Sequence, residues 1–295
     1  MANAQMMEQM AKSAGFIAAL DQSGGSTPKA LRGYGVAEDA YSNDEEMFAL
    51  IHDMRSRIVT SPCFNGEKVI GAILFERTMD GDADGTPVPQ KLWERGVVPF
   101  LKVDKGLEDE ADGVQLMKPM PELDALCERG VSKGIFGTKM RSVIHQASPS
   151  GIKAIVDQQF AVASQIGKHG LMPIIEPEVN IKSESRAECD AILHDELKSA
   201  LDALPEGEQV MLKLSIPAEA NLYSDLVAHP NVLRVVALSG GFSRDEACSE
   251  LTKNQGMIAS FSRALLQDLR HDMDDGGFDS ALGGAIDEIY EASAT

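Results

Sequence analysis

Residues 210–216 read VMLKLSI, an apolar segment with a single charged side chain, Lys213, near its centre. Successive side chains of an extended strand point to opposite faces, so Lys213 shares its face with Met211 and Ser215. The opposite face carries only aliphatic side chains, at Val210, Leu212, Leu214 and Ile216. This pattern predicts a strand that packs one face against helices and turns Lys213 towards an enclosed interior.

Short apolar segments of this kind recur along the whole chain, rich in Val, Ile, Leu and Phe and bounded by glycine, proline or polar residues. They lie at residues 15–21, 69–75, 97–103, 134–139, 171–178, 209–215, 232–239 and 256–261. Eight strands that alternate with helices over 295 residues favour an α/β fold, a single-domain (β/α)8 TIM barrel spanning residues 1–295. The first strand is not followed by the G-x-G-x-x-G motif of an open dinucleotide-binding sheet.

Helical periodicity fills most of the intervals between these segments. Residues 42–61 form an amphipathic segment that opens with Ser42 and Glu45, the spacing of a capping box. A second capping box, Ser243 and Glu246, follows the seventh segment, and Ser148 precedes a proline at a helix start. Helices are also expected at residues 185–204 and 280–292, and a polar loop at residues 80–86.

The acidic composition argues against nucleic acids and anionic membranes as partners. The chain has 27 basic and 46 acidic residues and a formal charge of −19, whereas nucleic acids and anionic membranes select basic surfaces. Neither a signal peptide nor an apolar stretch of membrane-spanning length is visible, which predicts a cytoplasmic protein. The dispersed cysteines are expected to be reduced thiols: Cys63, Cys127, Cys189 and Cys248. None of the six histidines belongs to a metal-binding motif, so no metal and no cofactor are expected.

In a TIM barrel the active site lies at the C-terminal ends of the strands, so charged residues there are the candidates. A lysine with a low pKa in an enclosed interior is the nucleophile that a Schiff base requires, which makes Lys213 the first candidate. The alternative is a structural lysine that pairs with a carboxylate. Glu176 and Glu178 point the same way from one strand, and crowding should raise the pKa of at least one of them. They are either acid–base groups or a neutralised pair at the rim.

Ser239, Gly240 and Gly241 end the seventh strand and lead into a capped helix. Backbone N–H groups at such a position favour an anion, and the loops after strands seven and eight of a barrel often hold phosphate. Arg263, after the eighth strand, is a candidate second clamp. The alternative is an ordinary glycine-rich connection.

Seven motifs in order resemble the class I fructose-bisphosphate aldolases, the Schiff-base type, and the short form resembles their bacterial branch. They cover residues 15–263 and read ALDQSGGS (19–26), PFLKVDKG (99–106), GTKMR (137–141), PIIEPE (173–178), MLKLSIP (211–217), LSGGFSRDEA (238–247) and FSRAL (261–265). The resemblance implies a cytoplasmic lyase that reversibly cleaves fructose 1,6-bisphosphate into dihydroxyacetone phosphate and glyceraldehyde 3-phosphate, in glycolysis or gluconeogenesis.

The resemblance also implies roles for individual residues. Lys213 matches the Schiff-base lysine, Glu176 the proton donor and acceptor, and Glu178 its electrostatic support. Asp21 matches the acid that orients the C4 hydroxyl, and Lys139 matches a cation that keeps the pKa of the Schiff-base lysine low. The implied phosphate contacts are Ser239, Gly240, Gly241 and Arg263 at C1, and Ser23, Ser26, Lys105 and Arg141 at C6. Met140 replaces a tryptophan of the animal members, which should alter the packing of the cavity.

Two alternatives stay open at this point. One is an aldolase for another ketose bisphosphate, such as tagatose 1,6-bisphosphate, and the other is a sugar-phosphate-binding barrel without covalent catalysis. In either case the partner is a small sugar phosphate, and the oligomeric state is open. Because such a substrate is anionic, the acidic excess should lie on the outer helices and loops, away from the strand ends.

Overall fold

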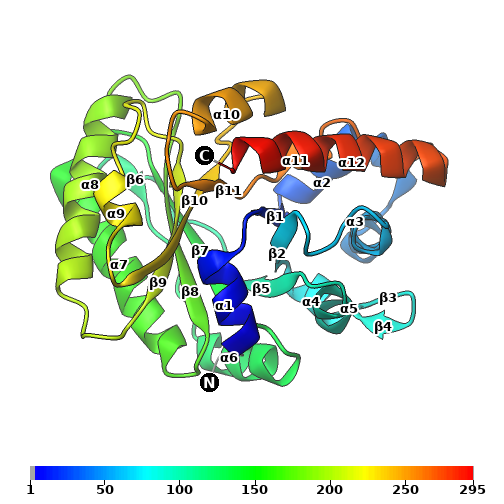
Figure 1. The fold of residues 1–295 in the computed structure, drawn as a ribbon, viewed down its shortest axis with the longest axis horizontal. Helices are drawn as coiled ribbons and strands as arrows, with labels where there is room; N and C mark the ends of the chain where they lie inside the picture. The colour runs from blue at the N-terminus through cyan, green and yellow to red at the C-terminus, as the bar shows by residue number, and fades with distance from the viewer. Residues whose placement is uncertain (1–3, 295) are drawn as a thin grey trace.

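The computed structural model describes residues 4–294 and contains a barrel of parallel strands, shown in Figure 1. Neighbouring strands pair in the order β1-β2-β5-β7-β8-β9-β10-β11. The Ala19 N–H donates to the Phe261 carbonyl at 3.0 Å and links the first strand to the segment after the last. The predicted (β/α)8 architecture is confirmed. The strands are β1 Phe16–Leu20, β2 Val69–Leu74, β5 Val98–Lys102, β7 Gly137–Ile144, β8 Met172–Val179, β9 Val210–Ser215, β10 Val232–Leu238 and β11 Ile258–Ala259.

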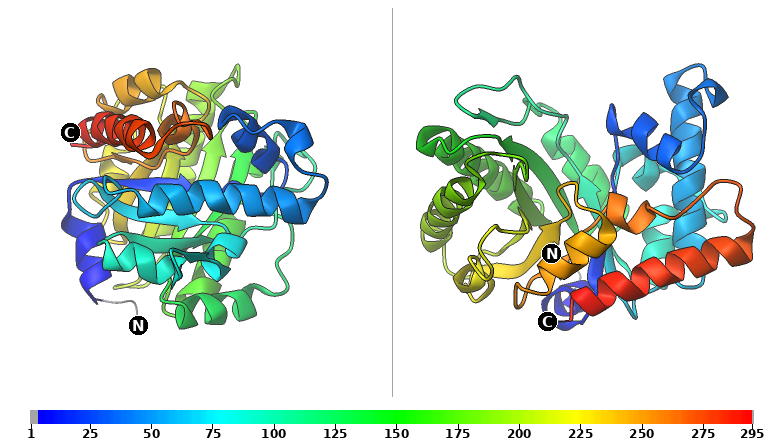
Figure 2. Two further views of the ribbon diagram at one scale, coloured as in Figure 1. Left: turned by 90° about the vertical axis from the view of Figure 1, so that its right-hand side faces the viewer. Right: turned by 90° about the horizontal axis from the view of Figure 1, so that it is seen from above.

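Helices surround the strands on the outside, and Figure 2 shows this arrangement from two further sides. The larger ones are α3 Asp44–Thr60, α7 Pro149–Gly167, α8 Arg186–Asp202 and α12 Asp275–Ala292. The shorter ones are α1 Ala4–Lys12, α2 Ser26–Gly33, η1 Glu38–Ala40, α4 Glu76–Asp80, α5 Val88–Glu94, α6 Leu123–Ser132, α9 Ser224–Val227, α10 Arg244–Leu251 and α11 Arg263–Leu266.

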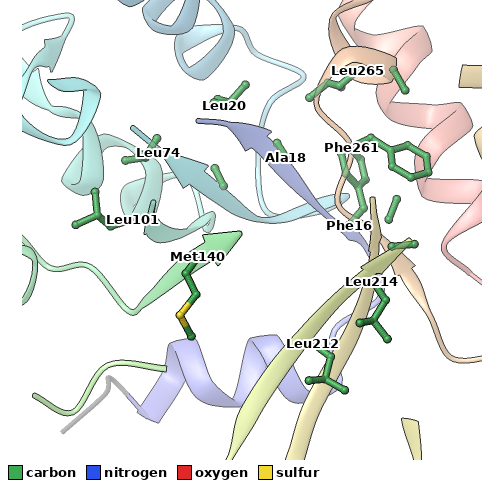
Figure 3. Close-up of a cluster of buried hydrophobic side chains, with 14 of the residues drawn as sticks. Phe16, Ala18, Leu20, Leu74, Leu101, Met140, Leu212, Leu214, Phe261 and Leu265 are labelled. Carbon is green, nitrogen blue, oxygen red and sulfur yellow. The ribbon is translucent and has the colours of Figure 1, made fainter. Parts of the chain in front are cut away.

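Strand alternation divides the buried side chains into two cores. The inner one fills the barrel with residues such as Ile17, Phe100, Ile174 and Met211, and Met10 of α1 belongs to it. The outer one lies between strands and helices and includes Leu212 and Leu214, as the pattern at residues 210–216 predicts (Figure 3). Strand β9 therefore turns Lys213 inwards because its aliphatic neighbours are buried against the helices.

Several local expectations are corrected. The cap of α3 is Asn43, whose side chain accepts from the Glu46 N–H, one residue beyond the expected Ser42 and Glu45 pair. The expected loop at residues 80–86 contains a hairpin, β3 Asp82–Ala83 with β4 Thr86–Pro87. Its turn residues Asp84 and Gly85 both have positive φ, the conformation of a tight hairpin turn.

Met140 lies in the outer core and is fully buried there, so it cannot alter the packing of the cavity as expected (Figure 3). Helix α12 begins at Asp275, five residues before the expected start. The caps at Ser148 and Ser243 are confirmed, the latter with a complete capping box to Glu246. Helix α1 is an element that no sequence pattern predicted.

Candidate active site

A cavity of about 880 Å³ opens at the C-terminal ends of the strands. Its walls come from β1, β5, β7, β8, β9 and β10 and from the loops that follow β1, β5, β10 and β11. It gathers most of the candidate residues, namely Asp21, Ser23, Ser26, Lys139, Arg141, Glu176, Glu178, Lys213, Ser239, Gly240 and Arg263. The structure thus joins residues separated by more than 240 positions in one enclosure.

Four buried charged side chains contact one another in sequence in the wall of this cavity, and we call them the four-charge chain: Lys213, Glu176, Lys139 and Asp21. Lys213 Nζ lies 3.2 Å from Glu176 Oε1, and Lys139 Nζ lies 2.9 Å from the other oxygen, Oε2. Lys139 Nζ also lies 2.7 Å from Asp21 Oδ2. Alternating charges at these distances can be buried together because each one is neutralised by its neighbours.

The pKa values of Asp21 and Lys139 in the four-charge chain are shifted in opposite directions. Burial alone raises the pKa of Asp21, but the charges of Lys139 and Lys213 outweigh it and hold that pKa far below its ordinary value. Burial lowers the pKa of Lys139, but the charges of Asp21 and Glu176 outweigh it and hold that pKa above its ordinary range. Asp21 is therefore ionised and Lys139 charged at neutral pH, so Lys139 supplies a permanent cation on the far side of Glu176.

The backbone at Glu176 is held by side chains as well as by a strand ladder. β8 and β9 pair at Ile174 with Met211 and at Ile175 with Leu212. Beyond these pairs, Gln159 Oε1 of α7 accepts the Glu176 N–H at 2.8 Å, and Ser215 Oγ donates to the Val179 carbonyl at 2.7 Å.

Pro177, which lies between Glu176 and Val179, has no N–H to satisfy. β8 and β9 therefore separate where Glu176 and Lys213 face each other, and side chains bond the Glu176 N–H and the Val179 carbonyl there.

Two further ion pairs line the cavity. Arg141 Nε lies 2.5 Å from Glu178 Oε2, so Glu178 is engaged with Arg141 and not with the lysine pair. Lys102 Nζ, at the end of β5, lies 2.7 Å from Asp104 Oδ1. Sequence reasoning missed Lys102, although it continues the inward alternation of Val98 and Phe100.

Lys105 is placed differently from the expectation. It lies outside the cavity lining and is about half exposed, and its Nζ lies 2.7 Å from Glu76 Oε2 of α4. Arg129 of α6 pairs with the same carboxylate. Strand β5 ends at Lys102, which points inwards and lines the cavity. Lys105 lies beyond the end of the strand, so strand alternation does not turn it towards the cavity.

The loops after β10 and β11 form one end of the cavity. Ser239 and Gly240 line it directly, whereas Gly241 is not among the lining residues. Gly240 has a φ of +59°, and a Cβ there would lie 2.6 Å from Ile181 Cγ2, so the loop requires glycine. A Cβ on Gly241 would lie 3.6 Å from Arg263 Nη2, which places the guanidinium beside the same loop.

Ser23 and Ser26 lie in the turn between β1 and α2. Ser26 Oγ accepts the Ser23 N–H at 3.0 Å and donates to the Ser23 carbonyl at 2.8 Å. Both hydroxyls stand on the wall that also carries Lys29.

The cavity as a whole is not acidic. Its carboxylates are Asp21, Asp104, Glu176 and Glu178, and its cations are Lys29, Lys102, Lys139, Arg141, Lys213 and Arg263. A pocket with more cations than carboxylates can attract an anion on a chain whose net charge is −19.

Several features of the chain bear on the other expectations. All four cysteines are free thiols. Across residues 4–294, no group of three or more His, Cys, Asp or Glu side chains is arranged to hold a metal ion. Within that same range, no helix is both long and apolar enough to cross a membrane.

The family model described as class-I fructose-bisphosphate aldolase matches residues 2–216, a span that includes the four-charge chain. The chain belongs to the class-I fructose-bisphosphate aldolase family. This class-I aldolase is thus a carbon–carbon lyase with a sugar-phosphate substrate. The match ends before Ser239 and Arg263, so it does not cover that end of the cavity.

Solved structures share the fold of this class-I aldolase. One is fructose-bisphosphate aldolase from Plasmodium falciparum, solved in complex with TRAP and a small-molecule inhibitor. It is 20% identical, with a TM-score of 0.80, over 98% of this chain and 93% of that one. Another is a protein of Corynebacterium glutamicum, 13% identical, with a TM-score of 0.56, over 98% of this chain and 92% of that one.

Proposed function

We propose that this aldolase reversibly cleaves fructose 1,6-bisphosphate into dihydroxyacetone phosphate and glyceraldehyde 3-phosphate through a Schiff base on Lys213. The observation that carries the proposal is the contact between Lys213 Nζ and Glu176 Oε1 at 3.2 Å inside a cavity rich in cations. A nucleophilic amine needs an adjacent proton acceptor. Glu176 is placed to be that acceptor, and Lys139 holds a fixed positive charge on its far side.

In this proposal, Glu176 carries the protons in each step of the reaction. Glu176 takes a proton from the Lys213 ammonium, and the neutral amine adds to the C2 carbonyl of the sugar. Glu176 returns the proton to the C2 hydroxyl, which leaves as water and creates an iminium. The carboxylate then takes the C4 hydroxyl proton while the C3–C4 bond breaks, and the bonding pair moves to the iminium nitrogen.

The aldehyde product departs at this stage. Glu176 then protonates C3 of the resulting enamine, and water hydrolyses the iminium to release the second product and free Lys213. Before cleavage, Asp21 accepts a hydrogen bond from the C4 hydroxyl and orients it, which its low pKa allows because the carboxylate stays ionised; the hydroxyl proton then passes to Glu176 as the C3–C4 bond breaks. Glu178, held by Arg141, contributes negative charge near the developing cations.

The two phosphates occupy opposite ends of the cavity in this proposal. The C1 phosphate lies at Ser239, Gly240 and Arg263, with Gly241 giving the loop its shape. The C6 phosphate lies near Ser23, Ser26 and Arg141, and Lys102 supplies the cation first assigned to Lys105. As part of the same proposal, the enzyme acts in the cytoplasm in glycolysis or gluconeogenesis.

Borohydride trapping tests the covalent step. Reduction in the presence of fructose 1,6-bisphosphate should add the mass of a reduced sugar-phosphate adduct to the peptide that contains Lys213, and should abolish activity. Lys213→Met should lose both the adduct and at least about 10³-fold in kcat. Lys198→Met, at an exposed lysine of α8, is the matched control and should keep both. Sugar-phosphate binding without any adduct would contradict the proposal and favour a non-covalent barrel.

The trap does not distinguish fructose from tagatose 1,6-bisphosphate, because both would use Lys213. The kcat/KM values for these two C4 epimers make that distinction. We expect the fructose epimer to be the better substrate, and a preference for tagatose 1,6-bisphosphate would revise the substrate while leaving the mechanism in place.

A further inference from the structure

The barrel closes at its shortest strand. β11 pairs with β10 at only two positions, Val236 with Ile258 and Ala237 with Ala259. Across the closing seam, the Ala19 N–H donates to the Phe261 carbonyl. The residues on either side of this seam are Asp21, at the end of β1, and Arg263, after β11. Contacts between the loops above the seam add to this backbone bond in fixing the relative position of Asp21 and Arg263.

Gln22 joins them. Its Nε2 donates to Ser262 Oγ at 2.5 Å and to the Ala19 carbonyl at 3.3 Å, so one amide group spans from β1 to the residue before Arg263. Only 8% of the Gln22 surface is exposed, so water competes little for these bonds even though Gln22 and Ser262 both line the cavity.

A buried arginine holds the other side of Gln22. Arg55 Nη2 of α3 donates to the Gln22 carbonyl at 2.5 Å and to Gln22 Oε1 at 3.1 Å, and Nη1 donates to Thr78 Oγ1 at 2.8 Å. Arg55 is 1% exposed, and burial lowers its pKa to about 10 against the pull of Asp21, so it stays charged at neutral pH. A charged donor orients the Gln22 amide so that its N–H group faces Ser262.

We infer that Gln22 is a positioning residue that sets the separation between the Arg263 phosphate clamp and the Asp21 strand end through the chain Arg55–Gln22–Ser262. The inference rests on the proposed function, in which Arg263 holds the C1 phosphate and Asp21 orients the C4 hydroxyl. A fixed separation between these two groups makes the cavity select the length of sugar that lies between C1 and C4. Neither Gln22 nor Arg55 has to touch the substrate for this effect.

Three variants test the chain of contacts. Ser262→Ala removes the acceptor and Gln22→Met removes the donor, and the third combines them. Each single variant should raise KM for fructose 1,6-bisphosphate about fivefold with kcat within about twofold, because the clamp is displaced while the four-charge chain is intact. The double variant should resemble either single one, because both substitutions break the same bond.

Inhibition by inorganic phosphate, used as a probe of the clamp, should weaken in parallel. Ser262→Thr keeps the hydroxyl and should restore KM. Independent effects that multiply in the double variant would overturn the inference, since they would mean that Ser262 meets the phosphate directly. An unchanged KM in Ser262→Ala would also overturn it. If Gln22→Met does not fold, the comparison of Ser262→Ala with Ser262→Thr still decides.

Wild-type trapping separates this inference from the proposed function. If the wild-type enzyme forms no borohydride adduct, the proposed function fails. If it forms the adduct and the variants behave as the wild type does, only the positioning role of Gln22 fails.

Discussion

The β7–β8 pair and the β11–β1 seam hold functional side chains in different ways: the first by long strand pairing, the second by a short strand and side-chain contacts. β7 and β8 pair in register over eight positions, from Gly137 with Met172 to Ile144 with Val179. They carry Lys139, Arg141, Glu176 and Glu178. At the seam, a two-residue strand leads through a short loop to Arg263, the first residue of α11, and side chains supply much of the link to β1.

This difference matches the demands of the two kinds of contact. Proton transfer and amine attack require donor and acceptor atoms at about 3 Å in a fixed orientation, which long paired strands provide. A phosphate presents several oxygens to any nearby N–H group or guanidinium, so loops can hold it with less exact placement. Perturbations of the paired strands should therefore reduce kcat, whereas perturbations of the loops should raise KM.

The largest effect should come from removing the cation at the centre of the four-charge chain. Lys139→Met leaves Asp21 and Glu176 without their shared partner, which should cost about 3 kcal/mol in the free energy of unfolding. The loss of the cation next to Lys213 should lower kcat by about 10³-fold. Urea unfolding and steady-state kinetics measure the two effects.

Lys133→Met is the control for Lys139→Met. Lys133 pairs with Asp80 on the protein surface, and such pairs contribute little, so stability should change by less than about 0.5 kcal/mol and kcat not at all. A Lys139→Met enzyme with near-normal kcat would show that the chain is structural only.

The next effect should come from the backbone support of Glu176. Gln159→Leu leaves the Glu176 N–H buried without an acceptor, which should shift the carboxylate and lower kcat about tenfold with little change in KM. Gln158→Leu is a close control, because the neighbouring Gln158 also binds backbone, at Met117, away from the cavity. It should lower stability by a similar amount while kcat stays constant. Equal kcat values in the two variants would show that Gln159 does not position Glu176 for catalysis.

How much of this was predictable depends on how far apart the contacting residues lie in the sequence. Lys213, Glu176 and Asp21 could be predicted because strand alternation and a charged strand end are local patterns. Gln22 and Ser262 touch across 240 positions, and no local pattern reports such a pair. Gln159 could not be predicted either, since its partner is a backbone N–H that only the separation of β8 from β9 leaves free.

Other misses had a local signal. The inward alternation of β5 indicates Lys102, but the resemblance directed attention to Lys105, which lies beyond the strand and pairs with Glu76. The Asp84–Gly85 pair is a hairpin signal inside residues 80–86, the segment expected to be a polar loop. Met140 follows from the alternation that turns Lys139 and Arg141 inwards and their neighbour outwards.

A smaller effect should come from the loop after β10. Gly240→Ala places a methyl group against Ile181 in a backbone conformation with positive φ, so the loop must shift. KM for the bisphosphate should rise about fivefold and kcat should stay within about twofold, because the paired strands are untouched. Gly207→Ala, also at positive φ but with open space around it, should leave KM unchanged. A loss confined to kcat would contradict the division between strands and loops.

The smallest effect on catalysis should come from a group behind strand β9 whose titration changes only the stability of the fold. Burial raises the pKa of Asp190 to about 6, only partly offset by the Ala218 N–H and Arg186. The folded protein thus binds this proton more tightly than the unfolded chain, so the stabilisation is complete below about pH 4 and is lost as pH rises through about 6.

Asp190→Asn keeps an acceptor for Ala218 and removes the buried charge. The variant should be more stable than wild type by about 2 kcal/mol at pH 7.5, with the gain vanishing near pH 4, as urea unfolding at several pH values would measure. Asp202→Asn is the opposite case, because hydrogen bonds from Lys198 and His229 lower the pKa of Asp202 and its loss should destabilise at neutral pH. Since Asp190 lies outside the cavity, kcat and KM should not change. A change in kcat would show that the loop after β9 also positions Lys213, which would extend the demand for exact placement beyond the paired strands.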